Sequence, residues 1–252
     1  MAGSNFIPPS APGAVVPRRR ILGLALFVIG FVAAVALTAL SVWGDLEASL
    51  FDTSGSAETS LRSLSCPVFI VRNETGHIAA SFSNTGERAI ERAIRVHISD
   101  GRVSLMREER VQEPLEPGAT ARLRWPVTVD DAAYGYLILA RVSTLRQFPM
   151  LAETGSCGVL VLPLTWGSGL VVLVAWLVLS LAGMIGGGWL YLSDRLQRVR
   201  RPRSTVTIFA LGIVAVAGLV VGLLGAWTAG VLVLALTFIL LIALFAQTML
   251  AD

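Results

Sequence analysis

Hydrophobic and polar positions divide the chain into two kinds of region. Four long apolar runs occupy 21–43, 166–191, 205–225 and 228–250, and none holds Asp, Glu, Lys, Arg or His. About 20 apolar residues suffice for a helix to cross the roughly 30 Å hydrocarbon layer of a membrane. The pattern therefore predicts four transmembrane helices, with a long polar block between the first and the second.

That polar block shows the period of two that is typical of β-strands. Ile78, Ala80 and Phe82 share one face of a strand, and so do Leu123, Trp125 and Val127 of a later one. Turn residues such as Asp100-Gly101 separate the runs. Seven strands are expected, at 66–72, 77–84, 90–99, 102–110, 119–128, 134–143 and 157–162.

Two stretches of this block resemble a known kind of module. They are SFSNTGERAIERAIRVHISDG, 81–101, and EPLEPGATARLRWPVTV, 113–129. Both resemble immunoglobulin-like modules of the CARDB (cell-adhesion-related) type, in which an Asn-x-Gly turn precedes an alternating strand and a Pro-Gly turn leads into another. The resemblance implies an immunoglobulin-like β-sandwich, and such modules share no catalytic residues.

Together these patterns predict a mixed membrane protein, an all-β immunoglobulin-like sandwich outside the cytoplasm plus four transmembrane α-helices. The sandwich covers 66–162, and the first helix covers 21–43. A tail at 1–20 holds four prolines and is expected to be disordered. The remaining parts are a linker or short helix at 44–65, the second helix within 163–193, a basic loop at 194–204, and a helical hairpin at 205–250.

The first apolar run has a second interpretation, because Ala34-Val35-Ala36 resembles a signal-peptide cleavage site. The apolar core of a signal peptide usually holds only about 7 to 15 residues. The 23 uncharged residues of 21–43 therefore favour an uncleaved anchor.

Charge indicates the orientation. The chain has 20 basic residues, all Arg, and those in 1–20, 194–204 and the C-terminal tail give these segments a net charge of +6, against −3 for 44–165. The positive-inside rule then puts both termini and the basic loop in the cytoplasm of a plasma (inner) membrane protein, with the β-domain outside. The absence of Lys excludes a Schiff-base or P-loop lysine.

The two cysteines agree with this orientation. Cys66 opens the first expected strand, Cys157 opens the last, and there is no third cysteine. A domain in an oxidising compartment would pair them, so we expect a disulfide. Two free thiols or a metal pair are the alternatives.

No residue pattern indicates catalysis or a cofactor. His77 and His97 lack metal-ligand spacing to a Cys or a carboxylate. Adjacent acids such as Glu108-Glu109 point to opposite faces of a strand, and Asp130-Asp131 is typical of a turn. Neither an enzyme nor a haem, metal or other cofactor is expected.

Three groups of residues are candidates for binding. Small residues at Gly183, Gly187, Gly218 and Gly222 favour close helix packing, within this chain or in a homodimer or larger complex. Arg195, Arg198, Arg200, Arg201 and Arg203 are candidates for lipid headgroup contact, whereas nucleic acid is not an expected partner. Phe148, Met150 and Leu151 either cover the end of the sandwich or contact a partner or the membrane surface.

The leading functional hypothesis is a non-catalytic structural, accessory or assembly subunit of a membrane complex, or an envelope-binding module. Its expected partners are membrane lipid and other membrane or envelope proteins. The alternative is an auxiliary component of a transporter or channel, although no span carries the ionisable groups that usually mark a transport pathway.

Overall fold

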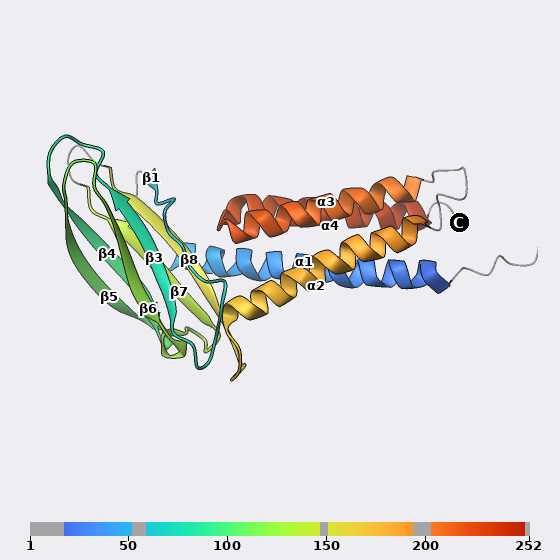
Figure 1. The fold of residues 1–252 in the computed structure, drawn as a ribbon, viewed down its shortest axis with the longest axis horizontal. Coiled ribbons are helices and arrows are strands. Elements are labelled where there is room, and N and C mark those ends of the chain that lie inside the picture. The colour runs from blue at the N-terminus through green and yellow to red at the C-terminus, as the bar shows by residue number, and fades with distance from the viewer. Residues whose placement is uncertain (1–17, 52–58, 147–150, 194–202, 250–252) are drawn as a thin grey trace, which may run out of the picture.

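The computed structural model describes residues 18–51, 59–146, 151–193 and 203–249. It has a β-domain at one end and four helices at the other (Figure 1). The helices are α1 (Arg18–Leu50), α2 (Gly169–Ser193), α3 (Arg203–Leu223) and α4 (Trp227–Met249). The strands are β1 (Thr59–Ser60), β2 (Phe69–Val71), β3 (Gly76–Ser83), β4 (Ile90–Asp100), β5 (Arg102–Leu115), β6 (Thr120–Val127), β7 (Leu137–Thr144) and β8 (Glu153–Leu162).

Two sheets form the β-domain. The larger has the order β1-β8-β7-β4-β5, with β2 also paired to β8, and the smaller consists of β3 and β6. β1 and β2 both run parallel to β8, whereas β4, β5, β7 and β8 pair antiparallel along the sheet. Between β1 and β2, Ser65 pairs with Ala79 of β3, so the first segment of the domain contacts both sheets.

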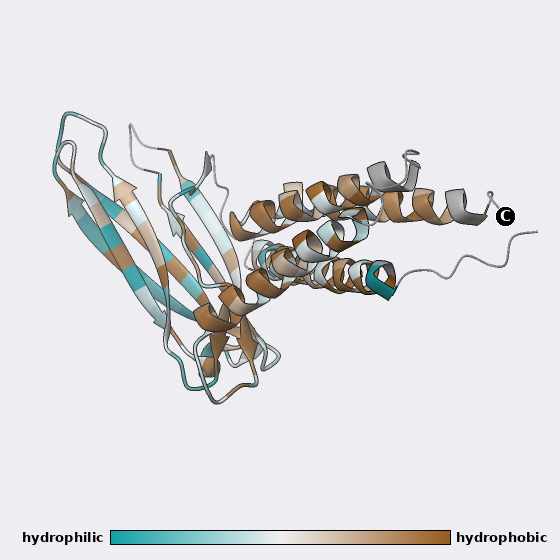
Figure 2. Ribbon diagram, turned by 45° about the vertical axis from the view of Figure 1, so that its right-hand side comes forward, coloured by the Kyte–Doolittle hydropathy of each residue, from teal (hydrophilic) through white to brown (hydrophobic). Residues whose placement is uncertain are grey.

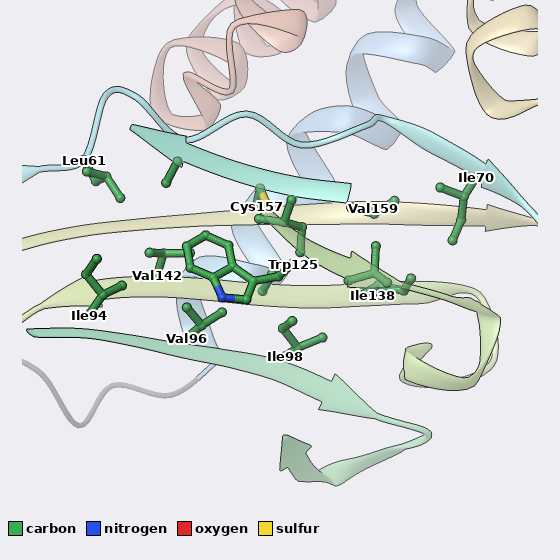
Figure 3. Packing of buried hydrophobic residues seen from close by; sticks show 14 of the residues in the cluster. Leu61, Ile70, Ile94, Val96, Ile98, Trp125, Ile138, Val142, Cys157 and Val159 are labelled. Atoms are coloured by element: carbon green, nitrogen blue, oxygen red, sulfur yellow. The ribbon is translucent and has the colours of Figure 1, made fainter. Parts of the chain in front are cut away.

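The core of the β-domain lies between the two sheets. Ile94, Val96 and Ile98 of β4 are buried there, and Trp125 of β6 is only 3% exposed (Figure 3). Ile78, Ala80 and Phe82 of β3 complete the opposite side, with Val127 beside them. The faces that alternation predicted to point inward are therefore the buried ones.

Helix α1 is longer than the sequence indicated. It runs without a break to Leu50, so 44–50 is helix, as one of the two expectations for 44–65 had it, but this helix continues the first one and is not a separate short helix. Its last turns cover the outer face of the larger sheet, where Ala48 packs with Ala133, Leu137 and Leu139. This packing explains why the helix continues past its apolar run, because the outer face of β7 and β8 needs a cover.

Among the described residues, three helices are long and apolar enough to cross a membrane, at Ile21–Leu50, Gly169–Ser193 and Trp227–Ala246. The corresponding part of α3, Ile208–Leu223, is shorter than the other three. Side chains such as Ile185, Ile213 and Leu232 are about 70% exposed on the outside of the bundle (71%, 68% and 71%). Figure 2 shows that hydrophobic residues prevail along the helices, whereas the strands mix hydrophobic and hydrophilic residues.

The expected strands all occur, with shifted ends. The first is only Phe69–Val71, and the last begins four residues early, at Glu153. The expected start at 134 is wrong, because Tyr134 has φ 56° and β7 begins at Leu137. β1 was not expected, and it extends the domain to Thr59, within the segment interpreted as a linker.

Candidate functional site: a polar cleft between the β-domain and the helices

A cleft of about 650 Å³ lies where the β-domain meets the ends of the helices. Three parts of the chain line it: the C-terminal part of α1 at Ser41 and Asp45, the β-domain at 60–68 and 154–158, and the α3–α4 turn at 222–227. The α3–α4 turn lies near β8 and α1 (Figure 1), so segments far apart in the sequence line this cleft together.

Two glycines bring α1 against β8 at this cleft. A Cβ atom built on Gly158 would lie 2.6 Å from Gly44 Cα and would clash with the Gly44 carbonyl as well. Real Cβ atoms do not approach backbone this closely, so only glycine fits at residue 158 without moving the helix. The backbones of α1 and β8 are therefore in direct contact.

This contact fixes Asp45, which is 7% exposed and lines the cleft. Its Oδ1 accepts a hydrogen bond of 3.2 Å from the backbone N–H of Gly158. Its Oδ2 faces the α3–α4 turn, 3.7 Å from where a Cβ of Gly225 would lie. Within the described part of the chain no donor bonds to Oδ2, so one oxygen of a nearly buried carboxylate is open to the cleft.

Asp45 ends a polar stripe on one face of α1. Thr38 and Ser41 precede it at helical spacing, are 3% and 9% exposed, and face α3. Thr38 Oγ1 donates to the Ala34 carbonyl of its own helix, and Ser41 Oγ donates to the Gly222 carbonyl of α3 at 2.9 Å. The stripe connects the cleft to the α1–α3 contact.

The predicted disulfide is confirmed. Cys66 and Cys157 are bonded, with their Cα atoms 6.5 Å apart, and both line the cleft. The bond fastens the segment before β2 to β8. It thereby holds one wall of the cleft beside Gly158, the residue that donates to Asp45.

The four predicted packing glycines lie at contacts between helices of this chain. A Cβ on Gly183 would lie 2.9 Å from Gly30 Cα, and one on Gly187 would clash with the Phe27 amide nitrogen. One on Gly218 would lie 3.2 Å from Thr38 Oγ1, and one on Gly222 would lie 3.6 Å from Ser41 Cβ. All four therefore face α1, which is the central helix of the bundle.

Two side chains of α2 add hydrogen bonds to the α1–α2 contact. Ser180 Oγ donates to the Gly30 carbonyl at 3.1 Å, and Trp176 Nε1 donates to the Ala33 carbonyl at 2.9 Å. These hydrogen bonds supplement the close backbone packing of α1 on α2.

The other candidate residues fall largely outside the described residues. This holds for Arg195, Arg198, Arg200 and Arg201, and for Phe148 and Met150. Arg203 begins α3, but only its backbone is described. Leu151 is 46% exposed, and its carbonyl accepts a 3.3 Å hydrogen bond from Arg92.

Acidic pairs of the β-domain take part in ion pairs. Arg110 donates a 2.7 Å hydrogen bond to Glu108, which lowers the pKa of that carboxyl, and Arg95 lies 3.1 Å away. Glu109 instead lies 3.6 Å from Arg107. Glu108 and Glu109 thus have separate partners, as strand alternation requires. No group of three or more potential metal ligands occurs among the described residues.

A second hollow, of about 580 Å³, is apolar and lies between α2 and α3 away from the β-domain. Phe27 of α1 contributes to it, with Met184 and Trp189 from α2 and Phe209 and Ile213 from α3. It presents almost no polar atoms to a ligand.

Comparisons with known proteins identify no family. No family model and no curated protein matches the chain. Partial likenesses were found to solved glycosidases. One is a β-glucosidase from Erythrobacter marinus, with 18% identity, TM-score 0.29, and coverage of 40% of this chain and 15% of that one. Another is β-glucuronidase 2 from Bacteroides uniformis, with 13% identity, TM-score 0.29, and coverage of 38% and 12%.

A third is a β-glucosidase from Listeria innocua, with 17% identity and TM-score 0.26, over 38% of this chain and 15% of that one. The chain thus spans less than a fifth of the length of each of these enzymes. Likenesses this low say nothing about its activity.

Proposed function

We propose that the chain is an integral membrane protein that holds an immunoglobulin-like β-sandwich rigidly outside the cytoplasm. In this proposal it serves as a non-catalytic accessory or assembly subunit of a membrane complex. The observation that carries the proposal is the unbroken helix α1, which passes through the bundle and then packs on the larger sheet. A domain fastened in this way presents its free surfaces to a partner at a fixed height and angle.

The connection between β8 and α2 also supports a rigid attachment of the β-domain to the helices. β8 ends at Leu162 and α2 begins at Gly169, so only a short turn separates sheet from helix. Glu74 Oε2 accepts a 2.7 Å hydrogen bond from the Gly169 N–H, and it also accepts one from Val71. Phe69 of β2 stacks on Trp176 of α2, with ring centroids 6.0 Å apart.

The strand order supports the immunoglobulin-like assignment. Two facing sheets, a first segment that contacts both, and parallel pairing of the first and last strands are consistent with such a sandwich. The resemblance to CARDB-type modules agrees with it. The disulfide differs from that of antibody domains, because it joins the segment before β2 to β8.

The proposed topology has four spans. α3 has 21 residues, which at 1.5 Å per residue extends about 30 Å, and a tight turn with Gly225 at φ 68° joins it to α4. Both termini and the basic loop then lie in the cytoplasm, on the side of the net charge of +6. The disulfide supports an oxidising compartment for the β-domain.

Cross-linking in native membranes tests the proposal. A photoreactive amino acid replaces Arg110, whose side chain is 69% exposed on the edge strand β5. The expected product is one discrete cross-linked species that also co-purifies in mild detergent. A matched variant carries the photoreactive group at Ile185, which is 71% exposed on α2. The proposal is wrong if both variants, at Arg110 and at Ile185, yield only the single chain of 26.8 kDa.

A further inference from the structure

We propose that the polar cleft binds the headgroup of a phospholipid with a primary ammonium group, of the phosphatidylethanolamine type. Asp45 would receive the ammonium and Arg62 the phosphate. The inference rests on the proposed placement of the β-domain at the outer membrane surface. It adds a ligand site that the accessory role does not require.

The first argument is the open oxygen of Asp45. Burial of most of the Asp45 side chain, which is 7% exposed, weakens the hydration of its carboxylate and so favours a hydrogen-bond donor on the oxygen that still faces the cleft. The Gly158 N–H serves Oδ1, and Oδ2 faces the cleft without a donor from the described residues. A ligand that donates hydrogen bonds and carries a positive charge satisfies this oxygen best.

Ser41 strengthens the preference for a donor. Its hydroxyl proton is already directed to the Gly222 carbonyl, so its oxygen faces a ligand only as an acceptor. Ser41 and Asp45 both line the cleft and lie one turn apart on α1. An ammonium group has three N–H donors and matches two neighbouring acceptors. The trimethylammonium of choline has no N–H donor, so it does not match these two acceptors.

The second argument is the cationic side of the cleft. Arg62 lines it from the β-domain side, is exposed, and has no ion-pair partner among the described residues. A guanidinium binds phosphate oxygens through two parallel hydrogen bonds. A carboxylate and a guanidinium on one hollow match a zwitterion, whereas an anionic headgroup would be repelled by Asp45.

The third argument is the position of the cleft. Its remaining wall is the α3–α4 turn, where Leu223 and Leu224 are 41% and 75% exposed and Trp227 begins α4. Tryptophan at the end of an apolar helix is typical of the headgroup level of a membrane. The cleft therefore combines polar groups from α1 and the β-domain with an apolar wall that would adjoin acyl chains.

A metal ion fits this site less well. Ca²⁺ takes six to eight oxygen ligands, and several of these are usually carboxylates. Asp45 is the one carboxylate that lines the cleft among the described residues. A lysine of a partner protein shares the ammonium chemistry, but it brings no phosphate for Arg62.

Native mass spectrometry of the purified full-length chain in detergent tests the proposal. The probes are short-chain phosphatidylethanolamine, phosphatidylcholine and phosphatidylglycerol, each titrated separately. The expected result is at least about tenfold tighter binding of phosphatidylethanolamine than of the other two. Because this comparison uses the unchanged protein, it does not depend on whether any variant folds.

Two substitutions locate the site. Asp45→Asn keeps the shape of the side chain and should weaken phosphatidylethanolamine binding about tenfold, and Arg62→Gln should weaken it severalfold. Glu47→Gln is the matched control, because Glu47 is an acid on the same helix that does not line the cleft. It should leave binding unchanged.

Three results would overturn the proposal. These are equal binding of the three lipids, an unchanged affinity in Asp45→Asn, and a carbodiimide cross-link between Asp45 and a lysine of a co-purifying protein. The accessory role is tested separately by cross-linking from Arg110. Absence of lipid selectivity together with an intact cross-link would reject the phosphatidylethanolamine site and leave the accessory role standing. Lipid selectivity without a cross-link would reject the accessory role and leave the lipid site standing.

Discussion

The burial of a single residue depends either on the local sequence pattern or on a contact with a residue far away in the sequence. Trp125 was predictable as a core residue, because Leu123, Trp125 and Val127 alternate with arginines along one strand. Asp45 was not predictable in the same way, because its burial depends on Gly158, which is 113 residues away in the sequence. The local signal for it is the spacing of Thr38, Ser41 and Asp45, which places three polar groups on one helical face.

Replacement of Trp125 by Ala should destabilise the β-domain by about 3 to 5 kcal/mol, since it removes a large side chain from a core that cannot fully collapse around the cavity. Hydrogen exchange of the β3 and β6 amides in the full-length chain measures this loss. Arg124→Ala, on the exposed side of the same strand, should change the free energy of opening by no more than about 0.5 kcal/mol. Equal effects of the two substitutions would mean that the assigned faces of β6 are reversed.

Removal of the disulfide should lower stability without changing the strands. Because Cys66 and Cys157 are 91 residues apart, their bond restricts a long loop in the unfolded chain, worth about 4 kcal/mol. The double change to Ala should lower the melting temperature by roughly 15 °C or more.

The control for this prediction is chemical reduction. Reductant should lower the melting temperature of the unchanged protein toward that of the double variant and should leave the double variant unaffected. Two alkylatable thiols in unreduced protein from native membranes would contradict the bond and weaken the outside placement of the domain.

Elements were predictable where one periodicity persists. β3, β4 and β6 show clear alternation and were located within one or two residues. β1 was missed because it has two exposed residues and is defined only by its pairing with β8. The continuity of α1 through 44–50 was missed because Gly44 and the acids after it are typical of a linker or a separate short helix, whereas packing on the sheet stabilises one continuous helix.

The packing of α1 on α2 gives a prediction with an internal control. Gly187→Ala should destabilise the bundle by about 1 to 3 kcal/mol, because the new methyl group would clash with the Phe27 backbone. Gly186→Ala adds the same group where nothing lies within 4 Å, and alanine favours helix over glycine by about 1 kcal/mol.

Thermal unfolding of the two variants in detergent distinguishes them. Gly187→Ala should unfold at a lower temperature than the unchanged chain, and Gly186→Ala should unfold at the same or a higher temperature. The reverse order would mean that residue 187 does not face α1.

At the scale of the whole molecule, the sequence indicated the parts but not how they meet. The apolar runs, the strand block and the cysteine pair were evident from composition and spacing. The cleft was not evident, because its walls come from α1, from the β-domain at 60–68 and 154–158, and from the α3–α4 turn. Periodicity within one segment gives no information about contacts between segments. The continuous α1 is what brings them together.

The placement of the β-domain on the opposite side of the membrane from the C-terminus is the central claim, and cysteine labelling of intact cells tests it most directly. One variant is Glu116→Cys, in an exposed turn of the β-domain, and the other has a cysteine appended after Asp252. The native cysteines are bonded to each other and do not compete for reagent. A membrane-impermeant maleimide should label Glu116→Cys in intact cells and the appended cysteine only after permeabilisation. Labelling of both sites under the same condition would contradict the account.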